Sequence, residues 1–316
     1  MMEKIEILKE KIKNAKSIAI CGHKNPDGDS LCSALALMQI IKLNFNKDAT
    51  VIYDGSIPRV LDGVPLRKSA VFWDKIPSDS KFDLFILVDY GTRKHLGDIE
   101  SFVNSAGFVV EFDHHYNDDK VGMLCFDDEQ MAAAAQIIYA VANKAGFVTD
   151  KNILDLFMLG IVTDTGHFKF VRNSNVFVDS AKLVDSGVSM PDVCNVLNNR
   201  DKKTVLVEAK AVSNTEFFMS GRLAIAVIDA KDYKKLDGRG ELVLSLLGQV
   251  HGVEYIVLLK EHRENLVGIS FRSKQVPINE IAESFGGGGH LFAAGAVVEG
   301  GLDEVKNKVL EAFKEM

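Results

Sequence analysis

Histidine and aspartate recur in four short segments of this sequence, close to the ends of apolar runs. The segments are GHKNPDGDS (22–30), VDYG (88–91), FDHH (112–115) and TDTGHF (163–168). In the first of them, Pro26 and Gly28 predict a turn that keeps the histidine and the two aspartates out of a regular helix. Imidazole and carboxylate groups in this number can bind divalent metal ions if the fold brings the segments together.

The apolar runs predict how these segments are positioned. SIAIC (17–21), FDLFILVDY (82–90) and GFVVEFDHH (107–115) have the length and composition of buried strands, and helical patterns lie between and after them. This alternation predicts an α/β domain in which helices cover both faces of a parallel sheet. Loops that follow parallel strands meet at one edge of the sheet, so three of the four segments are expected to converge there.

Turn chemistry is the alternative explanation for any one segment. Asp, Asn and Gly are the usual residues of turns, and an aspartate before a helix commonly caps that helix. Turn chemistry does not explain why several carboxylates would gather at one edge of a sheet. Carboxylates forced together repel one another, so the cluster needs cations to be stable.

A pair of divalent metal ions meets that need. In two-metal hydrolases the ions lie roughly 3.5–4 Å apart, activate a water molecule and neutralise a phosphoryl group. Imidazole and carboxylate ligands without thiolate favour Mn²⁺, with Mg²⁺, Co²⁺ or iron as alternatives. A zinc site is not expected, because Cys21, Cys32, Cys125 and Cys194 lack a paired spacing.

Composition excludes several classes of function. The chain has 37 Lys and Arg against 44 Asp and Glu, and this net charge of −7 argues against binding to long duplex nucleic acid. No segment approaches 18 consecutive apolar residues, so we expect no membrane span. The scattered cysteines are typical of a reducing compartment, and a cytoplasmic location is therefore expected.

The length and the change of pattern along the chain predict two domains. A chain of 316 residues suits two domains rather than one. We predict a parallel-sheet domain over residues 1–190 and a connecting helical linker over 191–214. A smaller mixed α/β domain follows over 215–316, where strand patterns dominate and the segment LDEVKNKVLEAFKEM predicts a final helix.

The four segments, in this order and spacing, resemble the four motifs of the DHH phosphoesterase superfamily. The segment GGGGHLFAAG (286–295), preceded by SFRS (270–273), resembles the DHHA1 domain that follows DHH in that superfamily. Together they cover nearly the whole chain. A two-domain chain of this size is most similar to the bacterial nanoRNase (oligoribonuclease) and pAp phosphatase family, where pAp is 3′-phosphoadenosine 5′-phosphate.

The resemblance implies a role for each polar side chain of the motifs. The implied metal ligands are His23 and Asp27 for one ion, Asp29, His114 and Asp164 for the second, and Asp89 as the bridge between them. Asp113 is implied to orient the histidines. His115 is implied to act near the substrate phosphate, as a hydrogen-bond donor or as the proton source for the leaving oxygen.

The glycine segment is a candidate phosphate site. The implied substrate-binding residues are Arg272, Gly287, Gly288, Gly289 and His290. Successive glycines can present backbone N–H groups to an anion, and the arginine and histidine add charge. The alternative is that the glycines form only a flexible loop.

The resemblance implies a manganese-dependent phosphohydrolase with small substrates. These are short RNA or DNA oligonucleotides, dinucleotides such as pApA, and pAp. Rival activities are hydrolysis of cyclic dinucleotides and of pyrophosphate, and a rival of another class is a nucleotide-binding regulator without catalysis. Cys32 stands where the family usually has glycine, in the helix predicted after the first motif. This departure puts the close packing of that helix in question but removes no ligand. No segment predicts a homodimer, which stays open.

Overall fold

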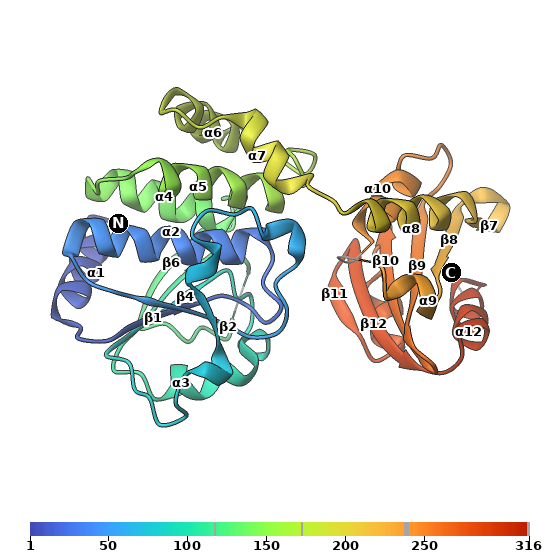
Figure 1. Cartoon of the computed structure of the whole chain (residues 1–316), viewed down its shortest axis with the longest axis horizontal. Coiled ribbons are helices and arrows are strands. Elements are labelled where there is room, and N and C mark those ends of the chain that lie inside the picture. Colours follow the sequence, from blue (N-terminus) through green and yellow to red (C-terminus); the bar gives the residue numbers. More distant parts are fainter. Residues whose placement is uncertain (117, 172, 237–239, 315–316) are drawn as a thin grey trace. The chain divides into compact units, whose positions relative to one another are not determined.

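The computed structural model describes residues 1–316 except 117, 172, 237–239 and 315–316 (Figure 1). The chain forms two compact units, Met1–Asn199 and Arg200–Met316. Each unit has its own β-sheet and its own apolar core. They are described separately below.

The first unit contains a six-stranded sheet with the order β3-β2-β1-β4-β5-β6, and every neighbouring pair in it is parallel. The strands are β1 (Ile18–Cys21), β2 (Thr50–Tyr53), β3 (Ala70–Phe72), β4 (Leu84–Val88), β5 (Val109–Asp113) and β6 (Leu124–Asp127). β1, β4 and β5 are buried along their whole length, as expected for strands covered on both faces.

Helices cover both faces of this sheet. The α-helices of the first unit are α1 (Met2–Asn14), α2 (Gly28–Phe45), α3 (Glu100–Asn104), α4 (Ala134–Ala145), α5 (Lys151–Asp164), α6 (Asn175–Asp185) and α7 (Met190–Leu197). The larger core joins one face of the sheet to α1, α2, α4 and α5, and the smaller core joins the other face to α3 and the 3₁₀ segment η4 (Arg93–Ile99) (Figure 1). Shorter 3₁₀ turns are η1 (Arg59–Leu61), η2 (Arg67–Ser69) and η3 (Trp73–Lys75).

The second unit contains a mixed sheet with the order β11-β12-β10-β9-β8-β7. The strands are β7 (Glu216–Phe218), β8 (Leu223–Ile228), β9 (Tyr255–Arg263), β10 (Leu266–Ser273), β11 (Gly288–His290) and β12 (Ala293–Glu299). β9 and β10 form an antiparallel hairpin, and β8 pairs with β9 in parallel.

Helices also lie on both faces of the second sheet. They are α8 (Lys202–Ser213), α9 (Ala230–Tyr233), α10 (Glu241–Gly248), α11 (Asn279–Ser284) and α12 (Leu302–Lys314), with one 3₁₀ turn, η5 (Met219–Gly221). One core joins the sheet to α8 and α10, and the other joins it to α11 and α12. The α/β fold class expected from the sequence, with a parallel sheet followed by a mixed sheet, is therefore confirmed.

The range 191–214 contains two helices that pack on different cores. Val193 and Leu197 of α7 belong to the core of the first unit, whereas Val207 and Ala211 of α8 belong to a core of the second. Among the described residues, no helix has the length and apolar character that crossing a membrane would require.

One local expectation was wrong. α2 begins at Gly28, so Asp27 is its N-cap and Asp29 lies in its first turn, not in an irregular loop. The Asp27 carboxylate accepts a hydrogen bond from Ser30 N (3.1 Å), which is the standard N-cap interaction. Gly28 did not exclude the helix, because it is the first helical residue and Asp27 before it supplies the cap.

Candidate metal centre

The candidate site lies at the carboxyl ends of the central strands of the first sheet. The strand order reverses between β1 and β4, since the chain runs outward from β1 to β2 and β3, then returns to β4 and runs outward again to β5 and β6. Open parallel sheets bind ligands at such a reversal, because the loops after the two strands diverge there. The loop after β1 carries His23 and Asp27, Asp89 follows β4, and β5 ends at Asp113.

Two groups of potential metal ligands lie at this edge. His23, Asp27 and Asp89 form one, in which His23 Nε2 is 3.6 Å from Asp27 Oδ1 and 3.8 Å from Asp89 Oδ2. Asp29, His114 and Asp164 form the other, in which His114 Nε2 is 3.4 Å from Asp164 Oδ2.

Asp89 connects the two groups. Its second carboxylate oxygen, Oδ1, lies 3.4 Å from His114 Nε2, and Asp89 also forms a further ligand group with His114 and His115. The structure therefore brings together all six side chains that the sequence motifs nominate as ligands, and it places Asp89 between them.

Two buried atoms at the centre lack hydrogen-bond partners. Within the described part of the chain, neither Asp89 Oδ1 nor His114 Nε2 has one. A buried polar atom without a partner is costly, and in native proteins it usually marks a missing ion or water. The donor set of imidazole and carboxylate groups fits a hard or borderline divalent cation. Divalent metal ions would satisfy both atoms.

The charges of the site also favour the binding of cations. Burial raises the pKa of Asp89 well above its usual range, and the nearby charges of Asp29 and Asp27 raise it further. Burial, and then Asp29, raise the pKa of Asp164 to about 7. Burial lowers the pKa of His23, but the hydrogen bond and charge of Asp27 and the charge of Asp89 outweigh it and raise the pKa to about 9. Carboxylates that destabilise one another in this way are stabilised by bound metal.

Asp29 has a structural role that sequence reasoning missed. Its oxygens accept hydrogen bonds from the backbone N–H groups of Ala134 (2.6 Å) and Ala135 (3.0 Å) at the start of α4, and from the Ser33 hydroxyl (3.1 Å). The N-cap of α4 is Ala133, which has no side chain able to cap. Asp29 of α2 therefore caps α4, and these hydrogen bonds hold its carboxylate close to the other potential metal ligands, His114 and Asp164.

Asp113 holds His115. Asp113 Oδ1 lies 2.8 Å from His115 Nδ1 and accepts a hydrogen bond from the His115 backbone N–H, while Oδ2 accepts one from Gly91 N. Burial raises the pKa of Asp113, but the hydrogen bonds and charge of His115 outweigh it and lower the pKa. The Asp113 carboxylate thus contacts both the backbone N–H and the ring of His115.

The loop after β1 is anchored by a residue that the motif analysis did not consider. Asp54, which follows β2, is buried and forms an ion pair with Lys24 (3.1 Å). Its backbone oxygen accepts a hydrogen bond from Asn25 N, at a residue with a left-handed φ of 55°. The sequence signal was an aspartate at the end of a strand, the same signal that identified Asp89.

The candidate substrate residues lie in the second unit. Arg272 of β10 and the backbone of His290 of β11 are both paired with Ala293 of β12, which lies between them. The side chain of His290 lies outside the described residues. The glycine segment is not a simple loop: Gly288 and Gly289 belong to β11, and a Cβ at Gly287 would lie 2.1 Å from the Gly295 carbonyl oxygen. A Cβ at Gly289, where φ is 145°, would likewise lie 2.6 Å from Ala294 Cα, so Gly287 and Gly289 are required where two backbones approach closely, whereas Gly288 has open space around it.

Comparison with protein families identifies the class. Residues 17–161 match the DHH family, N-terminal domain, and residues 240–316 match the DHHA1 domain. The chain belongs to the DHH family of phosphoesterases, with a DHHA1 domain following the DHH domain. The resemblance inferred from the motifs is thus confirmed, and DHH phosphoesterases use divalent metal ions, in agreement with the donor set.

Individual relatives extend over most of the chain. A bifunctional oligoribonuclease and PAP phosphatase, NrnA, from Thermus thermophilus is 29% identical, covering 99% of this chain and 94% of that protein. The cyclic-di-AMP phosphodiesterase GdpP of Bacillus subtilis is 25% identical over 97% of this chain but only 49% of its own length. A crystal structure of an exopolyphosphatase-related protein from Bacteroides fragilis shares the fold, with a TM-score of 0.89 at 20% identity, covering 100% of this chain and 95% of that one.

Proposed function

We propose that this protein is a two-metal phosphohydrolase that cleaves short oligonucleotides to mononucleotides and removes the 3′-phosphate of pAp. The observation that carries the proposal is the pair of ligand groups joined by Asp89, with Asp89 Oδ1 and His114 Nε2 buried and unpaired among the described residues. The substrate class is supported by relatives named oligoribonuclease and PAP phosphatase that span nearly the whole chain.

We propose that each of the two ligand groups holds one divalent ion. His23, Asp27 and Asp89 would hold one ion, and Asp29, His114 and Asp164 would hold the second, with Asp89 shared. Divalent ions bound there supply positive charge that neutralises a phosphoryl group, and they activate water at neutral pH. Mn²⁺ suits the mixture of imidazole and carboxylate ligands best.

His115 is proposed as the proton donor to the leaving oxygen. Burial lowers the pKa of its imidazole, but the hydrogen bond that the ring donates to Asp113 and the charge of Asp89 outweigh this and raise the pKa, so the ring holds a proton more tightly than a free histidine. The 2.8 Å contact between Nδ1 and Asp113 also fixes the ring orientation.

The second unit is proposed to bind the substrate phosphate. Arg272 can form two parallel hydrogen bonds to a phosphate, and the glycines of 287–289 leave backbone groups accessible at an edge strand. The net charge of −7 fits small substrates better than long nucleic acids.

The experiment is a substrate panel. Hydrolysis of pApA, pAp, a five-nucleotide RNA, cyclic di-AMP and pyrophosphate is measured with Mn²⁺, Mg²⁺, Co²⁺ or chelator. Mononucleotide released from pApA or RNA with Mn²⁺ supports the proposal, and its absence with every metal contradicts it. Asp89→Asn is expected to lose turnover, whereas the matched control Asp48→Asn, at a side chain that is 91% exposed, should retain it.

A second candidate is hydrolysis of cyclic dinucleotides. It is favoured by the relationship to the cyclic-di-AMP phosphodiesterase, which extends over 97% of this chain. The same panel separates the two candidates, because faster turnover of cyclic di-AMP than of pApA would favour the second.

A further inference from the structure

A carboxylate is buried in the middle of the central sheet, outside the groups described so far. Glu111 lies on β5 between β4 and β6, and only 1% of it is exposed. Its neighbours in the strand, Val110 and Phe112, are apolar core residues. Burying a carboxylate costs several kcal/mol unless it is well hydrogen-bonded, so an apolar residue would be the default in this position.

Three donors meet at one oxygen of Glu111. Glu111 Oε2 accepts hydrogen bonds from the Tyr90 hydroxyl (2.8 Å), Gly122 N (2.9 Å) and Val121 N (3.3 Å). The backbone at 122 approaches so closely that a Cβ there would lie 2.7 Å from Glu111 Cγ. The Glu111 carboxylate therefore connects the residue Tyr90, after β4, to the segment before β6 through hydrogen bonds.

Tyr90 connects this junction to the metal centre. It directly follows Asp89, and its side chain is buried, with 1% exposed. Asp89 itself has a left-handed φ of 49°, a conformation that is unfavourable for a residue with a side chain and persists only where neighbouring contacts impose it.

The contacts that impose it lie on the residues immediately after Asp89. The Tyr90 hydroxyl is held by Glu111, the Tyr90 carbonyl oxygen accepts a hydrogen bond from Thr92 N (2.8 Å), and Gly91 N donates to Asp113 (2.8 Å). The bonds to Glu111 and Asp113 both connect this turn to β5, and Asp89 N also donates to the Phe112 carbonyl oxygen of β5 (2.9 Å). The bond to Glu111 is the one that the Tyr90 side chain makes.

We propose that Glu111 and Tyr90 are positioning residues that hold the turn after β4 so that the Asp89 carboxylate faces both ligand groups. The pair touches no substrate and acts only through Asp89. This inference rests on the metal centre of the proposed function and is independent of which phosphoester is hydrolysed.

The test is the affinity of the full-length protein for Mn²⁺, measured by isothermal titration calorimetry. Tyr90→Phe keeps the buried ring and removes the hydroxyl that donates to Glu111. Loss of a group that orients a metal ligand weakens metal binding by about 10–100-fold, and we expect about tenfold here. The control is Tyr139→Phe, which removes a hydroxyl from another buried tyrosine of the same unit, on α4, and should leave Mn²⁺ affinity unchanged.

Substitutions at Glu111 distinguish positioning from general core stability. Glu111→Gln retains an oxygen that can accept from the same three donors and should bind Mn²⁺ almost as tightly as the unaltered protein. Glu111→Leu removes the acceptor and should weaken Mn²⁺ binding at least as much as Tyr90→Phe, provided that its circular dichroism shows a folded protein.

The possible results separate this inference from the proposed function. If Tyr90→Phe lowers the melting temperature in chelator yet binds Mn²⁺ as tightly as the unaltered protein, the pair is only structural and the positioning role is overturned. If the unaltered protein binds no Mn²⁺, Mg²⁺ or Co²⁺, the metal centre and the positioning role fall together, and this is known before any variant is compared. Normal metal binding without hydrolysis of the panel would contradict the proposed function alone.

Discussion

At the scale of single residues, Asp89 has the most demanding position in the protein. It is 2% exposed, it belongs to two of the ligand groups, and one of its oxygens is buried without a hydrogen-bond partner among the described residues. Its charge is destabilising without metal and stabilising with metal. Substitution of Asp89 should therefore have opposite effects on the stability of the metal-free protein and of the metal-bound protein.

Asp89→Asn is expected to stabilise the metal-free protein while abolishing stabilisation by metal. The neutral amide removes the buried charge and the repulsion that raise the pKa of Asp89, so the free energy of unfolding at pH 7 in chelator should increase. Thermal melts with chelator and with Mn²⁺ measure both effects. A metal-free variant that is less stable than the unaltered protein would contradict the electrostatic argument, and Asp48→Asn serves as the exposed control.

The stability of the metal-free protein should fall as the pH rises from about 4 to about 9. The pKa of Asp164 is raised from 3.8 to about 7, so between these values the folded state binds more protons than the unfolded state and loses stability with rising pH. His23, with a pKa raised from 6.5 to about 9, contributes stability below pH 6.5 that is lost as the pH rises through 9.

Melting temperatures in chelator across this range measure the dependence. Asp164→Asn should flatten the curve between pH 4 and 7, and His23→Gln should flatten it between pH 6.5 and 9. A melting temperature that rises steadily over the whole pH range would show that other titratable groups determine the pH dependence of stability.

At the scale of elements, the metal centre depends on one helix capping another. α4 has Ala133 at its N-cap, and its first N–H groups are satisfied by Asp29 of α2. Gly160 of α5 leaves space for this arrangement, because a Cβ there would lie 2.8 Å from Asp29 Oδ1 and 2.6 Å from Ala135 Cβ. The close packing of α2, α4 and α5 is thus part of the site. Cys32 of α2 is fully buried in this packing, so the departure from the family's usual glycine is accommodated.

Asp29→Ala and Asp164→Ala should have opposite effects on the metal-free protein, although both residues are proposed ligands of the same ion. Asp29→Ala leaves two buried N–H groups of α4 without an acceptor, which should lower the free energy of unfolding by about 1–2 kcal/mol despite the relief of repulsion. Asp164→Ala relieves the repulsion between Asp164 and the nearby aspartates, so it should raise the free energy of unfolding. Urea denaturation in chelator measures both values, and equal effects of the two substitutions would refute the capping role.

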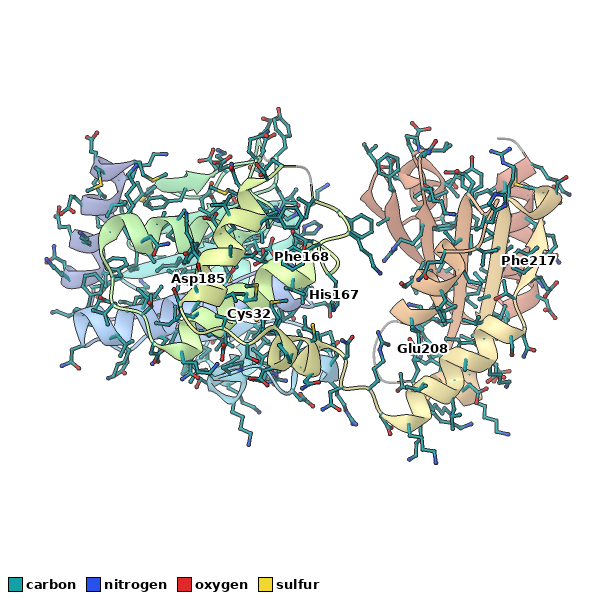
Figure 2. The ribbon with its side chains drawn as sticks, turned by 90° about the horizontal axis from the view of Figure 1, so that it is seen from above. Cys32, His167, Phe168, Asp185, Glu208 and Phe217 are labelled. Atoms are coloured by element: carbon teal, nitrogen blue, oxygen red, sulfur yellow. The ribbon has the colours of Figure 1, made fainter. Side chains whose placement is uncertain are left out.

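At the scale of the whole molecule, the two units have separate cores, and α8 belongs to the second. Figure 2 shows Glu208 on α8. Glu208 is fully buried, pairs with Arg200 (3.0 Å) and accepts a hydrogen bond from Leu242 N of α10. Both residues of this pair, and the core residues Val207 and Ala211, lie within residues 200–214. The second unit should therefore need residues 200–214 in order to fold.

A fragment of residues 200–316 is expected to fold cooperatively, whereas a fragment of 215–316 should not. The shorter fragment lacks Val207, Ala211 and the Arg200–Glu208 pair, and it exposes the face of the sheet that α8 covers. Far-ultraviolet circular dichroism and thermal unfolding of both fragments decide the matter. Equal stability of the two fragments would place the start of the domain at residue 215, as the sequence pattern suggested.

Some local features could be predicted because they depend on neighbours in the chain. The alternation of strands and helices, the C-terminal cap of α4 at Gly146 and the hairpin of β9 and β10 all follow from local patterns. The start of α2 was placed too late, because Pro26 and Gly28 were read as turn residues when Asp27 supplied a cap. Glu111 and Asp54 were not found, because an acidic residue in or after a strand has no local signal that distinguishes a buried hydrogen-bonded carboxylate from an exposed one.

Residue types and the period of apolar residues by themselves determined the edge of the sheet at which the acidic groups gather. The resemblance of the sequence motifs to the DHH superfamily implied the class of the protein and the candidate ligands. Only the tertiary structure showed that these side chains lie close together in two groups with Asp89 between them, and that Asp29 caps α4. The physical reason is that these relationships are distances between residues up to 135 positions apart, such as Asp29 and Asp164. Such distances are fixed by the packing of β1, β4, β5, α2 and α5 as a whole and by no single segment.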